Sequence, residues 1–223
     1  MPADGAGVSR SDQAAYGVWG VSKIAFEALT RQRFALLGRW LAAEHVARWW
    51  HHDPAPDAIE HDFGPAADGA ESAADFVVLD DGRPVGLIQY CLLRDYPEYF
   101  DELAGVAKVG AGTATIDYLI GESADTGRGL GTRMIRAFAD HVWAAWPGTT
   151  EILVPVNLGN VASWRALLAA GFVHLGQAEL DPDVPGDDRR HQLLLLRRPL
   201  TSGRPPSAPA SPARSGTGSS AST

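Results

Sequence analysis

The stretch most informative about the fold is TIDYLIGESADTGRGLGTRMIR, at residues 115–136. An apolar run of strand length is followed by a polar turn, a glycine-rich segment and a helical pattern. The apolar residues of that helical pattern recur on one face at Leu130, Met134, Phe138 and Val142. Glycines let backbone N–H groups approach a ligand, and the N–H groups at the start of a helix attract anions. The stretch therefore predicts a phosphate-binding site between a strand and a helix.

The glycine-rich segment has other interpretations, which its residues allow us to compare. A dinucleotide-binding turn requires glycines spaced G-x-G-x-x-G, and residues 127–133, GRGLGTR, do not have that spacing. A Walker-type loop requires Gly-Lys followed by Ser or Thr, which the segment lacks. Both nucleotide motifs are excluded. A tight turn that binds nothing remains the alternative to a phosphate site.

A second segment favours a ligand-binding loop over a turn that binds nothing. Residues 160–172, NVASWRALLAAGF, place an asparagine at the start of a helical pattern and a Gly-Phe pair at its end. Together with Gly129-Leu130-Gly131, they resemble the two signatures of the GNAT acetyltransferases, an R/Q-x-x-G-x-G/A acyl-coenzyme A loop and a later asparagine helix. Thr126 stands where that loop usually has Arg or Gln, but the family contacts pyrophosphate mainly through backbone N–H groups. Two signatures in the right order identify the chain as a member of this family.

The order of the predicted elements also resembles this family. We expect strands at residues 24–30, 75–79, 84–93, 113–120, 151–156, 172–180 and 191–196. We expect helices within residues 31–50, 130–146 and 160–170. Residues 53–72 and 95–103 are interpreted as excursions, the first of them mobile with some helical content. The resemblance implies an α/β class (an α+β mixed sheet), the GNAT acyl-CoA N-acyltransferase fold, with a splayed central sheet flanked by helices.

Composition sets the domain organisation and the broad class. We expect a flexible N-terminal extension at 1–20, a single acetyltransferase domain at 21–200 and a disordered Ser/Pro/Ala/Gly tail at 201–223. The net charge of −8 argues against a nucleic-acid partner and favours a cationic substrate. There is no apolar run of roughly 20 residues and no secretory signal in residues 1–11. We therefore expect a cytoplasmic protein without a membrane partner, either a monomer or a homodimer.

The resemblance also implies the cofactor and its site. Acetyl-CoA is the expected co-substrate, and no metal is expected, because the adjacent His51 and His52 cannot easily chelate one ion. The backbone at Leu119 and Ile120 is implied to orient the acetyl group and pantetheine. The remaining cofactor-binding residues are expected to be Thr126, Gly127, Arg128, Gly129, Leu130, Gly131, Thr132 and Asn160.

Asp117 is the candidate catalytic residue. It lies in an otherwise apolar strand, where an acid is unfavourable to bury without a purpose. The alternative is that its carboxylate is solvated or paired with an arginine. As a functional group, the carboxylate would bind a substrate ammonium and help its proton to leave.

Within the family, the chain resembles the aminoglycoside 6′-N-acetyltransferases most. The matching pieces are Trp49-Trp50, Gly86 with Gln89, Ile116-Asp117 and the loop that contains Gly129. The resemblance implies direct attack by the substrate amine in a ternary complex, and resistance to these antibiotics. The implied substrate-binding residues are Trp49, Gln89, Glu98, Tyr99, Asp101, Asp117, Asp181 and Asp183.

Three departures from that group leave other functions open. Pro155 stands where the group has an acid, the asparagine helix has leucine where many members carry the tyrosine that protonates the thiolate, and the 95–103 sequence is not the group's. One alternative is a siderophore-type lysine acyltransferase, although the histidine usual in its central strand is missing. Others are acetylation of a peptide N-terminus or another small amine, and a non-catalytic domain that senses acyl-coenzyme A.

Overall fold

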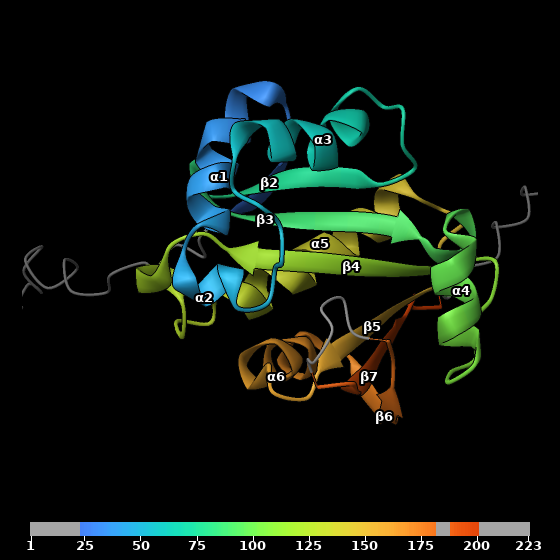
Figure 1. Ribbon diagram of the computed structural model, residues 1–223. Coiled ribbons are helices and arrows are strands. Elements are labelled where there is room, and N and C mark those ends of the chain that lie inside the picture. Colours follow the sequence, from blue (N-terminus) through green and yellow to red (C-terminus); the bar gives the residue numbers. More distant parts are fainter. Residues whose placement is uncertain (1–22, 182–187, 201–223) are drawn as a thin grey trace, which may run out of the picture.

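The computed structural model describes residues 23–181 and 188–200. The extension at 1–20, the tail at 201–223 and Asp183 lie outside these residues. The described residues form one mixed sheet of seven strands in the order β1-β2-β3-β4-β5-β7-β6 (Figure 1). The strands are β1 (Ile24–Ala28), β2 (Ala74–Asp80), β3 (Arg83–Leu92), β4 (Thr113–Ile120), β5 (Glu151–Asn157), β6 (Val173–Glu179) and β7 (Arg190–Arg197). All seven confirm strands that the sequence predicts.

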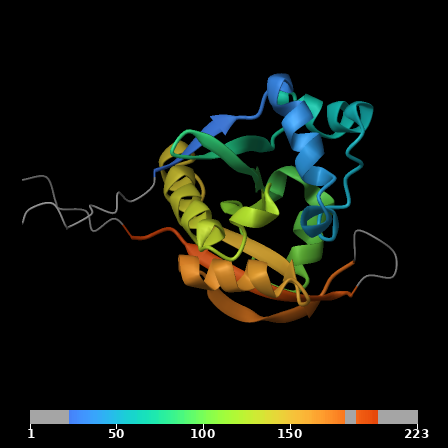
Figure 2. The ribbon, with the colours of Figure 1, turned by 90° about the vertical axis from the view of Figure 1, so that its left-hand side faces the viewer.

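The helices divide between the two faces of the sheet. They are α1 (Phe34–Leu41), α2 (Glu44–Ala47), α3 (Pro56–Ala67), α4 (Pro97–Ala104), α5 (Leu130–Ala145) and α6 (Val161–Ala170), with short 3₁₀ turns η1 (Arg31–Arg33), η2 (Leu93–Asp95) and η3 (Ser123–Asp125). Figure 2 shows the group α1–α3 and helix α5 on opposite sides of the central strands. Because side chains alternate along a strand, Leu87 and Leu119 pack under α1–α3, whereas Ile88 and Ile116 pack against α5.

The sheet splays where its one parallel pair begins. Strands β4 and β5 are paired only at Thr113↔Glu151 and Ala114↔Ile152. Beyond these residues the two strands diverge, and β5 continues with β7 and β6 as a separate wing (Figure 1). This confirms the splayed sheet. The backbone of β4 beyond Ala114 is consequently open on the side that faces β5.

Two segments that we interpreted as excursions contain regular helices. Helix α3 begins with Pro56 at its first turn, a position that needs no N–H donor, and it buries Ile59 and Phe63, which lie one turn apart. Helix α4 likewise begins with a proline, Pro97, and buries Leu103. We expected some helical content in residues 53–72 but no helix in residues 95–103. Proline and acidic residues are favourable in the first turn of a helix, and here they mark the starts of α3 and α4 rather than loops.

Candidate active site

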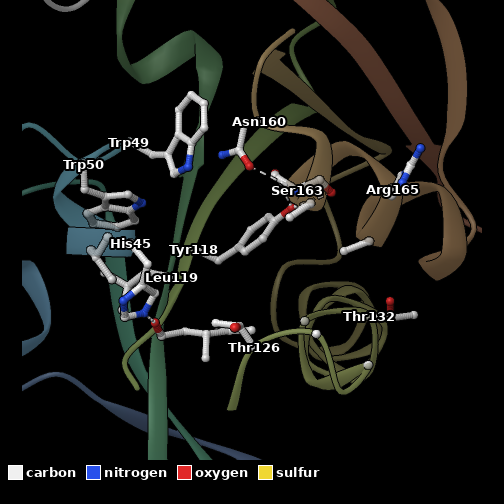
Figure 3. Close-up of a pocket in the computed structure, with 17 residues that line it drawn as sticks. His45, Trp49, Trp50, Tyr118, Leu119, Thr126, Thr132, Asn160, Ser163 and Arg165 are labelled. Atoms are coloured by element: carbon white, nitrogen blue, oxygen red, sulfur yellow. Dashed lines mark hydrogen bonds between the residues drawn. The ribbon is translucent and has the colours of Figure 1, made fainter. Parts of the chain in front are cut away.

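A cavity of about 530 Å³ opens where β4 and β5 diverge. The segment that follows α2 forms one wall, β4 and the glycine-rich loop form the floor, and the start of α6 forms the other wall (Figure 3). Its lining residues are His45, Val46, Trp49, Trp50, Tyr118, Leu119, Ile120, Thr126, Gly127, Gly129, Gly131, Thr132, Asn160, Ala162, Ser163, Arg165 and Ala166. We call it the cofactor cavity.

The glycine-rich loop has the backbone geometry of an anion site. Gly127 and Gly129 have φ angles of 71° and 75°, a left-handed conformation that glycine adopts without strain. Gly129 is the N-cap of α5, no side chain caps this end, and its first turn contains no acid. The first N–H groups of α5 are therefore left for a ligand, at the positive end of the helix.

An ion pair fixes the entry to this loop. Arg83 on β3 donates two hydrogen bonds to Asp125, of 2.8 and 3.1 Å, just before Thr126. The Arg83 guanidinium lowers the pKa of Asp125 below its usual value. Thr126 is turned back on the preceding residues by a bond from its hydroxyl to the Ser123 carbonyl, of 2.7 Å. The loop is thus held before a ligand arrives.

The open backbone of β4 faces the cofactor cavity at alternate residues. The Gly121 N–H donates to the Val85 carbonyl on β3 at 2.9 Å, so the backbone groups of Leu119, two residues earlier, also point to β3. Those of Tyr118 and Ile120 point into the opening. The Ile120 carbonyl accepts a hydrogen bond from His45 Nε2 at 2.9 Å. The N–H groups of Tyr118 and Ile120 face the same opening and can donate to an acyl or amide oxygen.

Asn160 caps α6 at the opposite wall. Its Oδ1 accepts a hydrogen bond from the Ser163 N–H at 3.2 Å, which satisfies one of the first N–H groups of the helix. In Figure 3 the amide nitrogen of Asn160 points away from Ser163 and toward Trp49. The cap therefore turns an N–H₂ donor into the cavity.

Most of the predicted cofactor residues line the cofactor cavity, and two do not. Leu119, Ile120, Thr126, Gly127, Gly129, Gly131, Thr132 and Asn160 line it. The Leu130 side chain is only 4% exposed and packs in the core below α5, because it belongs to the apolar face of that helix. The Arg128 side chain is exposed outside the lining.

Tyr118 is a lining residue to which the sequence assigned no role. Its hydroxyl lies 2.8 Å from Ser163 Oγ, so it joins β4 to α6 across the splay (Figure 3). Burial raises the pKa of the Tyr118 phenol above its ordinary value, which keeps the hydroxyl protonated. Because side chains alternate along β4, Tyr118 lies on the face opposite Asp117. The divergence of β5 opens that face to a ligand.

A second cavity, of about 420 Å³, adjoins the first, and we call it the acceptor cavity. Trp49 and Trp50 line both cavities. Asp117 lines the acceptor cavity and Leu119 lines the cofactor cavity, two residues apart on one face of β4. The full lining of the acceptor cavity is Trp49, Trp50, His51, His52, Gln89, Tyr99, Glu102, Asp117, Pro155, Leu180, Asp181 and His191.

The acceptor cavity contains five of the predicted substrate residues, namely Trp49, Gln89, Tyr99, Asp117 and Asp181. Glu98 and Asp101 are exposed on α4 and do not line it. The helical period of α4 explains the difference, since Tyr99 and Glu102, three residues apart, share the inward face. Glu102 Oε1 accepts a hydrogen bond from the Asp181 N–H at 2.6 Å and so joins α4 to the end of β6.

A row of polar side chains crosses the sheet beside this cavity. Asp75, Gln89 and Asp117 are successive partners in the register of β2, β3 and β4. Gln89 Nε2 donates to Asp75 Oδ1 at 2.9 Å. Asp75 is 7% exposed, and desolvation raises the pKa of its carboxyl to about 6. Burial, and then the charge of Asp117, raise the pKa of Tyr99 well above its usual value.

The described residues give no sign of a metal centre or a membrane span. Across residues 23–181 and 188–200, no three or more His, Cys, Asp and Glu side chains are grouped so that they could hold a metal ion. None of the helices in this part of the chain is long and apolar enough to cross a membrane.

Together, the fold and the two cavities define a class of enzyme. A splayed sheet with an anion-binding loop, and an acidic cavity that meets it at β4, suit the transfer of an acyl group from a coenzyme A thioester to an amine. Residues 30–180 match the family model described as an acetyltransferase (GNAT) domain, and the chain belongs to this family. It is an acetyl-CoA-dependent N-acetyltransferase, with acetyl-CoA as the acetyl donor.

Individual members of the family are similar to this chain in sequence and in structure. The chain is 26% identical to the aminoglycoside N(6′)-acetyltransferase type 1 of Klebsiella pneumoniae, over 70% of this chain and 77% of that protein. The protein of the same name from Serratia marcescens gives the same values. The structure of aminoglycoside acetyltransferase AAC(6′)-Ib with coenzyme A has a TM-score of 0.68 at 22% identity, over 79% of this chain and 95% of that chain. An aminoglycoside N(6′)-acetyltransferase from Legionella pneumophila has a TM-score of 0.57 at 20% identity, over 78% and 91%. The structural likenesses show the shared fold.

Proposed function

We propose that this enzyme acetylates the 6′-amine of an aminoglycoside, by direct attack on acetyl-CoA in a ternary complex. One observation carries the proposal: the acceptor cavity is lined by three acidic residues, Asp117, Glu102 and Asp181, and meets the cofactor cavity at β4. An aminoglycoside carries several ammonium groups, which such carboxylates attract. The relatives named aminoglycoside N(6′)-acetyltransferases support the same acceptor.

The residues divide the chemistry between the two cavities. In the acceptor cavity, Asp117 binds the substrate ammonium and takes its proton, so that the nitrogen lone pair can attack the thioester carbonyl. The new bond joins nitrogen to the acetyl carbon, the nitrogen loses its second proton to water, and the carbon–sulfur bond then breaks to release the thiolate. Backbone N–H groups of β4 that face the opening stabilise the oxyanion between these steps.

The leaving thiolate needs a proton. A thiol has a reference pKa of about 8.5, so the thiolate is a tolerable leaving group even when water protonates it. The Tyr118 hydroxyl lies in the cofactor cavity, bonded to Ser163, and its raised pKa keeps it available as a hydrogen-bond donor. We assign the stabilisation of the thiolate to this hydroxyl pair.

The biological consequence is antibiotic resistance. Acetylation converts an ammonium group into a neutral amide and removes one positive charge from the aminoglycoside. Bacteria that express the protein are therefore expected to tolerate higher concentrations of aminoglycosides that carry a 6′-amine.

The test is thiol release from acetyl-CoA with paired aminoglycosides that carry either an amine or a hydroxyl at the 6′ position. We expect turnover with the amine, none at that position with the hydroxyl, and a collapse of the rate in Asp117→Asn. Equal turnover with both members of a pair would overturn the 6′ assignment. Binding of coenzyme A without thiol release for any amine would indicate a sensor, and turnover confined to lysine-like amines would indicate the siderophore-type alternative.

A further inference from the structure

Asp75 is a buried acid that the chemistry above does not use. It lies on β2. Its register partner on β3, Gln89, lines the acceptor cavity, whereas Asp75 itself does not. Gln89 is in turn the register partner of Asp117. The three side chains share the sheet face that α1–α3 cover, because Val77, Leu87 and Leu119, each two residues away on the same strand, pack under those helices.

The hydrogen bond between Asp75 and Gln89 has a direction. A glutamine amide has a donor end, Nε2, and an acceptor end, Oε1, whereas an ionised carboxylate can only accept. Gln89 Nε2 donates to Asp75 Oδ1 at 2.9 Å, so the ionised acid holds the donor end. The reverse orientation would place two acceptor oxygens against each other in a buried site. The acceptor end, Oε1, is the end left for the cavity.

We propose that Asp75 is a positioning residue, which fixes the Gln89 amide with its carbonyl oxygen toward the substrate. Gln89 then presents an acceptor next to the Asp117 carboxylate, and this pair selects a substrate group that carries N–H or O–H donors. This assignment rests on the proposed function in one respect, namely that the acceptor substrate is an aminosugar rich in such donors.

Charged groups around Asp75 set the pH range over which it acts. Desolvation is the main cause of its raised pKa of about 6, and the nearby Glu71 adds to it. The hydrogen bond from Gln89 and the charge of His52 act in the opposite direction. Glu71 itself accepts a bond from the Tyr96 hydroxyl at 3.0 Å, and His52 is paired with Asp62 of α3 at 2.8 Å. The only other ionisable side chain linked to Asp75 among these described contacts is the Cys91 thiol, whose pKa burial raises to about 12.

Protonation of Asp75 releases the constraint. A carboxylic acid has an O–H donor, which can bond to Gln89 Oε1 and stabilise the reversed amide. The reversed amide presents N–H groups to the cavity and repels an ammonium. Substrate binding is therefore expected to weaken as the pH falls through about 6, independently of the acetyl donor.

The direct test observes the Gln89 side-chain amide by ¹⁵N NMR between about pH 5 and about pH 8. The signals are assigned by their loss in Gln89→Leu. We expect them to titrate with a midpoint near 6 in the wild type and to become independent of pH in Asp75→Asn. Asp140→Asn, which removes an exposed acid from α5, is the matched control and should retain the wild-type titration. Signals that do not respond to pH in the wild type, or that titrate equally in Asp75→Asn, would overturn the assignment.

Kinetics separate this assignment from the proposed function. With an aminoglycoside that the wild-type enzyme acetylates, Asp75→Asn should raise the KM for that aminoglycoside about tenfold. Little change is expected in kcat or in the KM for acetyl-CoA. Adding Asp75→Asn to Gln89→Leu should cause no further rise, because both changes remove the same oriented acceptor. Additive effects would overturn the role of Asp75. If the wild type acetylates no aminoglycoside, the proposed function fails, and the NMR titration alone decides the role of Asp75.

Discussion

The two cavities are built in different ways. The cofactor cavity takes its anion-binding groups from the backbone of a short local segment, the loop at 126–132, beside the end of β4, the cap of α6 and the side chains of Trp49 and Trp50. The acceptor cavity is formed by side chains from distant segments, including the tryptophans that follow α2, Gln89 on β3, α4 and the end of β6. Backbone groups suit a donor that never changes, whereas side chains can adapt to one acceptor. Substitutions on the two sides should therefore have separate effects.

The largest expected effect is that of Asp117→Asn, on the acceptor side. Removal of a general base typically lowers the rate by about 10²- to 10⁴-fold, and we expect kcat/KM for the aminoglycoside to fall within this range. The dissociation constant of coenzyme A, measured by calorimetry, should remain within about twofold, because Asp117 lies outside the cofactor cavity. A large loss of coenzyme A affinity would show that the two cavities are not independent.

Asp75→Asn should stabilise the protein while it impairs substrate binding. The Asp75 carboxyl has a pKa of about 6 when folded and about 3.9 when unfolded, so folding takes up a proton between these values. Its contribution to the free energy of unfolding is present at low pH and falls as the pH rises from about 4 to about 6. Above pH 7, the variant should gain up to about 3 kcal/mol in denaturant unfolding.

The control for this stability prediction is Asp140→Asn, whose exposed carboxyl should change the free energy of unfolding by less than about 0.5 kcal/mol. Equal stability of wild type and Asp75→Asn at pH 8 would show that burial does not disfavour the Asp75 charge.

Gly129→Ala tests the cofactor side. Gly129 has a φ of 75° and no heavy atom within 4 Å of an added Cβ, so the substitution acts through backbone strain of about 1–2 kcal/mol rather than through a clash. We expect the dissociation constant of coenzyme A to rise about tenfold, while that of the aminoglycoside is retained. Gly148→Ala is the matched control, since Gly148 has open space around it and no left-handed φ. Unchanged affinity for coenzyme A in Gly129→Ala would exclude the loop as the phosphate site.

The smallest expected effect is that of Tyr118→Phe, which keeps the ring and removes the hydroxyl that contacts Ser163. Loss of about 1 kcal/mol of hydrogen bonding to the leaving thiolate should lower kcat about fivefold, with both KM values retained. Steady-state kinetics with both substrates saturating measure this directly. An unchanged kcat would leave water as the proton donor.

The sequence predicts the cofactor side better than the acceptor side, and the reason is locality. Thr126 and Gly129 belong to one local turn and Asn160 caps its own helix, so the local pattern contains most of the information. Leu130 and Arg128 were included because a motif does not say which side chains turn inward. The burial of Leu130 follows from the apolar face of α5, whereas the Arg128 side chain is exposed in the loop before that helix.

The acceptor side depends on packing between distant segments. Asp117 was predicted as an acid in an apolar strand, and Gln89 from the resemblance to the aminoglycoside 6′-N-acetyltransferases. Glu98 and Asp101 were predicted in place of Glu102 because the sequence did not fix which face of α4 turns inward. Asp75 carried no signal in the sequence, since its burial arises only when the elements around β2 are folded over it. Some helical content was predicted for residues 53–72, but not a regular helix of the length of α3.

The measurement that tests the account most directly is the position of the acetyl group on the product. An aminoglycoside with several amines is incubated with the wild-type enzyme and acetyl-CoA, and the product is analysed by two-dimensional NMR. The account predicts a single acetyl group on the 6′ nitrogen. An acetyl group on another nitrogen, or recovery of the unmodified aminoglycoside, would contradict it.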